Sequence, residues 1–151
     1  MDPMERAVRY LNARMSTCHQ MKMYLRRKGY EDEEIEPVIE ELVNYGYLDD
    51  LKYSRLFMEA GFEKGRGMDR IRRELIQKGV DRDIIKEAEE DVEKPDEFTV
   101  AMEIARGIIE NRDVDDLERE EKEKLKAKVA RRLAGRGYTS DVIYRVIGKL
   151  I

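Results

Sequence analysis

The sequence predicts an all-α protein in which three tandem three-helix repeats form an elongated, curved array. A pattern of leucine, basic residue, glycine, bulky apolar residue and isoleucine occurs three times, around Gly29, Gly79 and Gly137. Apolar residues spaced by three and four on both sides of each glycine indicate two amphipathic helices joined by a tight turn. The glycines lie 50 and 58 residues apart, which leaves room for one further helix in each repeat. Because repeats of this kind bury their apolar faces against their neighbours, an extended shape is expected.

We expect the first repeat at residues 1–46, with its first helix over residues 3–15. Thr17 followed by Gln20 is a capping-box pattern, which predicts the start of the second helix. Gly29 ends that helix, because glycine adopts the left-handed backbone conformation at low steric cost.

The third helix of this repeat carries the apolar residues Ile35, Val38, Ile39 and Leu42. Pro37 lies among them, and a proline in a helix interior removes a backbone hydrogen bond and clashes with the preceding turn. We therefore expect this helix to begin late or to kink at Pro37.

The second repeat is expected at residues 47–93. Either Asp49 or Asp50 can cap its first helix, and Asp81 can cap its third. Three glycines, Gly61, Gly65 and Gly67, are expected to make the connection after the first helix flexible. The second and third helices are expected at residues 68–78 and 82–92.

The third repeat is expected at residues 94–151. Its boundary is marked by Pro95, because proline seldom continues a helix and often starts one. An acidic stretch at residues 113–123 accounts for the wider glycine spacing, and Thr139 is a natural cap for the last helix. The three helices are expected at residues 98–111, 117–134 and 140–150.

The composition fits exposed helices in a reducing compartment. Charged residues make up 42% of the chain and apolar residues 41%, and the apolar residues keep a helical period, which argues against disorder. The single cysteine, Cys18, excludes an internal disulfide. No apolar run approaches the roughly 20 residues that span a bilayer, and the N-terminus lacks the apolar core of a signal peptide. We expect a cytoplasmic protein with no membrane contact.

The residues needed for catalysis or metal binding are few. Cys18 and His19 are adjacent on a helix, so their side chains point about 100° apart and do not form a nucleophilic pair. One cysteine and one histidine are too few for a zinc site. Phosphate-binding glycine motifs after a strand are absent as well. We expect no catalytic residue, metal, cofactor or small-molecule ligand, and therefore no enzyme.

Positive charge is concentrated in the second helix of every repeat, although the net charge is −4. Residues 125–151, for example, carry seven basic side chains and one acidic one. Two interpretations stay open. The basic helices could form a surface for phosphates or an acidic partner. Alternatively, they could complement helix C-termini and be neutralised within the fold by the acidic third helices. The aromatic residues are expected to pack in the core and not to form a base-stacking platform.

One stretch of the sequence resembles a known family. Residues 46–80 contain GYLDD, then Tyr53, Arg55 and Phe57, then GRG, and finally KGV, and this order is similar to the signature of RecX regulatory proteins. The resemblance is strong over residues 5–92 and weaker beyond Pro95. After Phe57, members often carry further arginines, and they often carry a proline at the position of Met68. This chain has Met58 to Phe62 and Met68 instead, which lowers the local positive charge.

The resemblance implies an all-helical regulator of the RecA recombinase, with a role in DNA repair, recombination and the SOS response. Such a protein binds the RecA filament on single-stranded DNA, lodges in its groove and inhibits ATP hydrolysis and strand exchange. A monomer is expected. The alternative function is a sequence-independent single-stranded nucleic-acid binder that acts without RecA. The expected contact residues for RecA or DNA are the matched basic positions and two from the third repeat: Arg55, Arg66, Arg70, Arg72, Arg73, Arg131 and Arg132.

Overall fold

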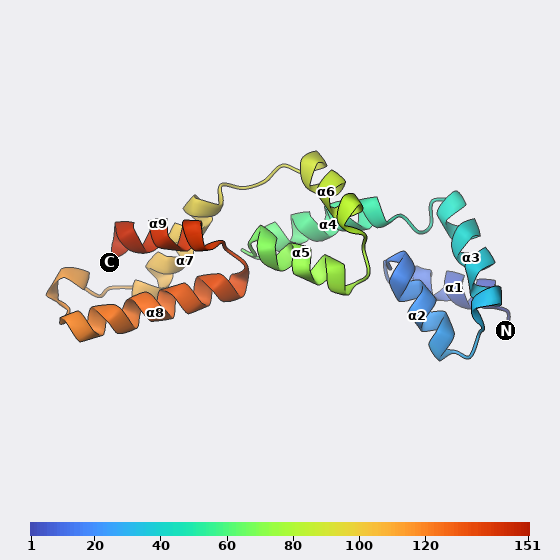
Figure 1. Cartoon of the computed structure of the whole chain (residues 1–151), viewed down its shortest axis with the longest axis horizontal. Coiled ribbons are helices and arrows are strands. Elements are labelled where there is room, and N and C mark those ends of the chain that lie inside the picture. The colour runs from blue at the N-terminus through green and yellow to red at the C-terminus, as the bar shows by residue number, and fades with distance from the viewer. The chain divides into compact units, whose positions relative to one another are not determined.

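The computed structural model describes all 151 residues and contains only helices (Figure 1). This confirms the predicted all-α class, and the helices follow one another as three groups of three. None of them has the length and apolar character that a membrane-spanning helix needs. The elements are α1 (Pro3–Ala13), α2 (Cys18–Arg27), α3 (Asp32–Asn44), α4 (Asp50–Glu63), α5 (Met68–Gln77), α6 (Arg82–Asp91), α7 (Glu97–Ile109), a 3-10 turn η1 (Val114–Asp116), α8 (Arg119–Arg136) and α9 (Ser140–Leu150).

The chain divides into two compact units. The first unit contains Met1–Phe57 and Glu74–Val92, and the second contains Met58–Arg73 and Glu93–Ile151. The division crosses α4 and α5, so the middle group of helices contributes to both units. The repeat boundaries at residues 46/47 and 93/94 stay a prediction.

The core of the first unit lies among α1, α2 and α3. Met21 and Leu25 of α2 are fully buried against Ile35 and Leu42 of α3. Ala7 of α1 is buried in the same core. These positions are the apolar residues of the repeat pattern, spaced by three and four on each helix. Thr17 caps α2 as predicted, with Gln20 completing the capping box.

Helix α3 begins at Asp32 and runs through Pro37, so the prediction of a late start is wrong. Pro37 lies in the second turn of the helix and on its exposed side. The proline leaves one backbone carbonyl without its helical donor, but a carbonyl on the solvent side can bond to water. The capping box between Glu31 and Glu34 also fixes the helix start ahead of the proline.

The core of the second unit lies among α7, α8 and α9. Ala101 and Ala105 of α7 contact Val129 and Leu133 of α8, and Val146 of α9 is fully buried between them. The acidic stretch holds the short turn η1, and α8 begins after it at Arg119, two residues later than predicted.

The three predicted turn glycines share one backbone geometry. Their φ angles are 95° at Gly29, 85° at Gly79 and 102° at Gly137, all in the left-handed region. In each turn, the residue after the glycine donates its N–H to the carbonyl of the leucine five positions before it, at 3.1–3.2 Å. This is the six-to-one bond of a Schellman motif, which satisfies a carbonyl at the helix end. The repeat is therefore confirmed at the level of individual hydrogen bonds.

The aromatic residues follow the prediction with three exceptions. The rings of Tyr10 and Tyr24 stack at 4.1 Å between α1 and α2, and Tyr138 is buried in the second unit. Tyr45, Tyr47 and Tyr144 are instead 69%, 67% and 78% exposed. Tyr45 and Tyr47 flank the left-handed Gly46 in the turn between α3 and α4, and nothing lies within 4 Å of a Cβ placed on that glycine.

Candidate functional site

A close contact between two turns shapes the candidate site in the second unit. The backbone N–H of Gly67, just before α5, donates to the carbonyl of Arg136 at 2.7 Å. The hydroxyl of Tyr138 donates to the carbonyl of Gly65 at 2.8 Å. A Cβ placed on Gly137 would lie only 2.3 Å from the Cβ of Arg70, so this position accepts glycine alone. The contact brings the first turn of α5 beside the last turns of α8.

A basic cleft of about 490 Å³ lies at this contact. Its lining contains five cationic side chains and no carboxylate. Like charges gathered in one cleft repel each other, and that repulsion is relieved by a bound anion. The arrangement therefore favours phosphate groups or carboxylates as ligands. The basic cleft is formed by Arg70 of α5 and by Lys128, Arg131, Arg132, Gly135 and Arg136 of α8.

Two of the cleft arginines are also tied to the backbone around the contact. Arg70 Nη1 donates to the carbonyl of Gly135 at 3.5 Å, and Arg136 Nη1 donates to the carbonyl of Lys64 at 3.3 Å. These bonds orient the guanidinium groups before any ligand binds, which reduces the entropy lost on binding. Arg131 and Arg132 are exposed to solvent. The site thus combines two oriented arginines with two exposed ones.

Three of the seven predicted contact residues come together in the basic cleft: Arg70, Arg131 and Arg132. The structure also adds Lys128 and Arg136, which the prediction of contact residues omitted. A signal for them was present, because Lys128, Arg132 and Arg136 recur every four residues and so share one face of α8.

The other four predicted residues lie outside the cleft. Arg55 belongs to the first unit, where its Nε and Nη2 donate to Asp91 at 3.0 and 2.6 Å. Arg72 donates to Asp69 within α5 at 2.9 Å. Arg66 lies in the turn before α5, and Arg73 is exposed on that helix.

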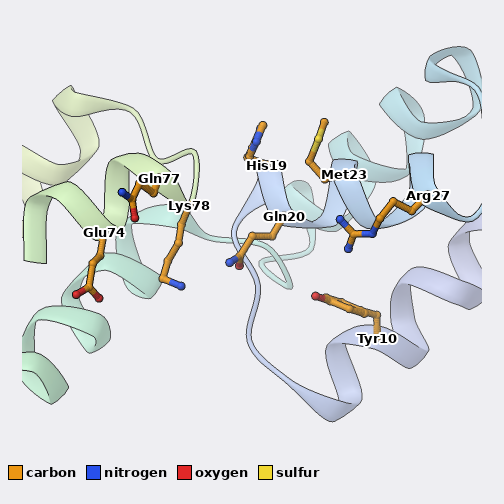
Figure 2. A pocket seen from close by; sticks show the side chains of 8 residues that line it. All are labelled: Tyr10, His19, Gln20, Met23, Arg27, Glu74, Gln77 and Lys78. Atoms are coloured by element: carbon orange, nitrogen blue, oxygen red, sulfur yellow. The ribbon is translucent and has the colours of Figure 1, made fainter.

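A second cavity, of about 670 Å³, lies in the first unit (Figure 2). Glu74, Gln77 and Lys78 come from the end of α5 and the turn after it, and they face Tyr10 of α1 and Gln20 of α2 across the space. The lining also includes His19, the only histidine. Cationic, acidic and neutral polar groups are mixed here, so this cavity has no single charge preference.

The surroundings of Cys18 disfavour a reactive thiol. Burial, and then the nearby Asp50 carboxylate, raise the pKa of the Cys18 thiol to about 12. The nucleophilic form of cysteine is the thiolate, which is scarce at neutral pH when the pKa is this high. The structure also contains no group of three or more histidine, cysteine or acidic residues placed to hold a metal ion.

Family models of known proteins match this chain in three successive parts, one for each group of helices. Models of the first, second and third three-helix domains of RecX match residues 4–42, 49–88 and 101–147. The chain is 34% identical over 139 residues to the regulatory protein RecX of Vibrio parahaemolyticus, covering 92% of this chain and 85% of that protein. It is 32% identical over 145 residues to the regulatory protein RecX of Clostridium botulinum, covering 95% of this chain and 66% of that protein. The chain thus spans about two thirds of the length of the clostridial relative.

Solved structures show the same fold at lower sequence identity. The crystal structure of RecX from Lactobacillus salivarius matches with a TM-score of 0.80 at 21% identity, and the match covers 98% of this chain and 94% of that one. A crystal structure of a regulatory protein RecX matches with a TM-score of 0.78 at 24% identity, over 97% of this chain and 70% of that one.

Proposed function

This chain belongs to the RecX family of regulatory proteins, and from that premise we propose that it binds RecA filaments on single-stranded DNA and inhibits their ATPase and strand-exchange activities. The protein acts by docking in the filament groove, as a cytoplasmic monomer that binds and does not catalyse. The observation that supports this proposal most directly is the basic cleft. It gives a regulatory protein of net charge −4 a localised surface for a polyanionic partner.

The chemistry of the basic cleft suits a filament that carries DNA phosphates and acidic side chains. Arginine presents planar pairs of N–H donors that match the two oxygens of a carboxylate or phosphate. Four of the five cationic residues of the cleft are arginines. Groups of the filament that enter the cleft are no longer available to other ligands of the filament. Inhibition by this contact therefore requires no reactive group.

The ATPase of RecA on single-stranded DNA tests the proposal. With the protein titrated into preformed filaments, we expect the rate of ATP hydrolysis to fall and to saturate at a definite ratio of protein to RecA. An unchanged rate at saturating protein would contradict the proposal. A rise in the rate would retain the interaction with RecA and overturn inhibition.

The second candidate is a nucleic-acid binder that acts without RecA, and the same basic cleft favours it. If all five cations neutralised phosphates of a single strand, the affinity would fall with salt with a log–log slope of about −3.5. Fluorescence anisotropy with a labelled oligonucleotide and no RecA measures this slope. Tight binding with a slope near that value, together with no effect on RecA, would favour the second candidate.

A further inference from the structure

Two exposed tyrosine rings lie beside each other in the turn between α3 and α4. Tyr45 and Tyr47 are 69% and 67% exposed, and their ring centroids are 6.3 Å apart. Val43, near the end of α3, adds an apolar side chain that is 45% exposed. The N–H of Tyr47 donates to the carbonyl of Leu42 at 2.9 Å, so the turn that carries both rings is closed by a backbone hydrogen bond.

This turn belongs to a stretch of the chain that carries only acidic charges. Residues 29–51 contain nine carboxylates and no lysine, arginine or histidine. Two of these carboxylates are neutralised by α2, where Arg26 pairs with Asp32 at 2.7 Å and Lys22 pairs with Glu36. The carboxylates closer to the tyrosines form no ion pair. Their charge is therefore offset by nothing in this chain.

Three exposed carboxylates are placed next to the rings. Glu41 lies one helical turn before Tyr45, so the two side chains share a face of α3. Tyr47 and Asp49 stand on either side of the buried Leu48, and both are exposed. The last turn of α3 also has no basic residue to offset the partial negative charge of the helix C-terminus. We define the tyrosine patch as Glu40, Glu41, Tyr45, Tyr47 and Asp49.

Elsewhere in the chain, aromatic rings are covered by the chain's own cations. Five rings have a lysine or arginine at 4.4–5.9 Å from the ring centroid. For two of them, Tyr10 and Tyr24, the cation belongs to the residue four positions later. The residue four positions after Tyr45 is Asp49 instead, and no cation of this chain lies over Tyr45 or Tyr47. The tyrosine patch thus offers the acceptors of a cation without the cation.

The chemistry of the tyrosine patch selects a positively charged ligand. The faces of tyrosine rings attract ammonium and guanidinium groups, and carboxylates accept paired hydrogen bonds from arginine. A nucleic acid would bring phosphates against carboxylates, and the tyrosine patch contains no cation to offset that repulsion. Two copies of this chain, each with a net charge of −4, also repel each other. The best complement is a cationic segment of a different protein.

We propose that the tyrosine patch binds the cationic side chains with which RecA holds DNA. A protein that binds DNA presents lysines and arginines to the phosphates, so RecA carries the charge that complements the patch. Their cationic groups stack on Tyr45 and Tyr47 and pair with the neighbouring carboxylates. The tyrosine patch therefore competes with DNA for RecA, whereas the basic cleft contacts the assembled filament. This inference rests on the proposed function and adds a second contact surface, in the first unit.

Binding to fluorescently labelled RecA without DNA, followed by anisotropy, tests the inference. We expect Tyr45→Ala with Tyr47→Ala to weaken this binding about tenfold, because two ring faces are lost. Glu40→Gln with Glu41→Gln should weaken it about threefold and reduce its dependence on salt. All four residues are exposed, so these substitutions remove no core contact.

Two control variants remove the same chemistry from other surfaces. Glu87→Gln with Glu90→Gln removes two exposed carboxylates from α6, which is the third helix of its group, as α3 is. Tyr144→Ala removes a ring that is 78% exposed in the second unit. Each control should change binding to DNA-free RecA by less than about twofold.

A single-stranded oligonucleotide tests whether the patch and DNA use the same cations of RecA. The variant in which Arg70, Arg131 and Arg132 are replaced by alanine has lost most of the basic cleft, so the patch is its main contact. We expect the oligonucleotide to release this variant from RecA. Retention of the variant at saturating oligonucleotide would overturn the inference.

The other outcomes separate this inference from the proposed function. If both patch variants bind DNA-free RecA as the wild type does, or if the controls weaken binding equally, the inference is overturned. Self-association or oligonucleotide binding that depends on Tyr45 and Tyr47, measured by sedimentation and anisotropy, would assign the patch to another ligand and also overturn it. A wild-type protein that inhibits preformed filaments but does not bind DNA-free RecA would overturn the inference alone. If it does neither, the proposed function falls as well.

Discussion

The carboxylate of Asp50 accepts a hydrogen bond from the backbone N–H of Cys18 at 2.9 Å, so the first residue of α4 caps helix α2 of the preceding group. The second unit has the same arrangement, in which Glu97, the first residue of α7, accepts from the N–H of Met68 at 3.0 Å. A negative charge at a helix N-terminus is favourable because the backbone dipoles place partial positive charge there. Successive groups are thus joined by caps that cross from one to the next.

Replacing Asp50 with alanine should lower the free energy of unfolding by about 1–2 kcal/mol, because both the hydrogen bond and the charge are lost. Asp50→Asn should lose less, since the amide oxygen can still accept. Asp83→Ala is the matched control, because this exposed aspartate stands in the first turn of α6. Urea unfolding followed by circular dichroism measures all three. Equal losses for Asp50→Ala and Asp83→Ala would contradict the account.

Thr17 makes two bonds that different substitutions can separate. Its hydroxyl oxygen accepts from the N–H of Gln20 and its hydroxyl proton goes to the carbonyl of Lys78. We expect Thr17→Val to lower the free energy of unfolding by about 2 kcal/mol, because this fully buried site loses both bonds while keeping its shape. Thr17→Ser should retain most of the stability. Thermal unfolding that ranks the serine variant with the valine variant would contradict the role of the hydroxyl.

The fold was predictable from the sequence because its signals are local. The turn glycines, the capping box at Thr17 and the apolar spacing each follow from the conformational preferences of a few neighbouring residues. Asp49 and Asp50 show where such reasoning ends. Either could have capped α4, and the structure gives that bond to Asp49 and directs Asp50 to α2 instead. Which aspartate caps which helix depends on how the groups of helices dock. The spacing of residues in the sequence does not predict that docking.

The basic cleft could be predicted only in part for the same reason. Positive charge on the second helices was visible, but Arg70 meets Arg131 and Arg132 only because two glycine-containing turns touch. Arg55 matched the family signature equally well and lies in the other unit, paired with Asp91. Charge along a sequence identifies candidates, and tertiary contacts select among them.

Alanine substitutions of Gly137 and Gly135, both at the C-terminal end of α8, should change the free energy of unfolding in opposite directions, because only Gly137 contacts Arg70 closely. Gly137→Ala should lower the free energy of unfolding by more than about 1 kcal/mol, because it combines a left-handed backbone with a Cβ 2.3 Å from its neighbour. Gly135→Ala should raise it by about 0.5–1 kcal/mol, since Gly135 is helical and has open space around its Cβ position. Chemical denaturation measures both, and effects of the same sign would contradict this assignment.

Cys18 should react slowly with thiol reagents in the folded protein. With a pKa of about 12, its thiol stays protonated at pH 8, and half-burial limits access. Because folding raises the pKa of the Cys18 thiol, the folded protein keeps the thiol proton up to a higher pH than the unfolded chain does. The associated stability is present below the ordinary pKa of cysteine and is lost as pH rises toward 12. Labelling of Cys18 with a chromogenic disulfide should be slow in the folded protein and fast in denaturant. The thiol introduced by Lys28→Cys should label quickly in the folded protein, because residue 28 is exposed. Rapid native labelling of Cys18 would contradict this account.

The most direct test of the regulatory role compares the RecA ATPase on single-stranded DNA with two charge-matched triple variants. Arg70→Ala, Arg131→Ala and Arg132→Ala together remove three cations from the basic cleft. Arg119→Ala, Lys122→Ala and Lys124→Ala remove three from the other end of α8. The account predicts that the wild-type protein and the second variant lower the ATPase at the same concentration, and that the cleft variant needs about tenfold more. Equal inhibition by the correctly folded cleft variant would show that the cleft does not contact the filament.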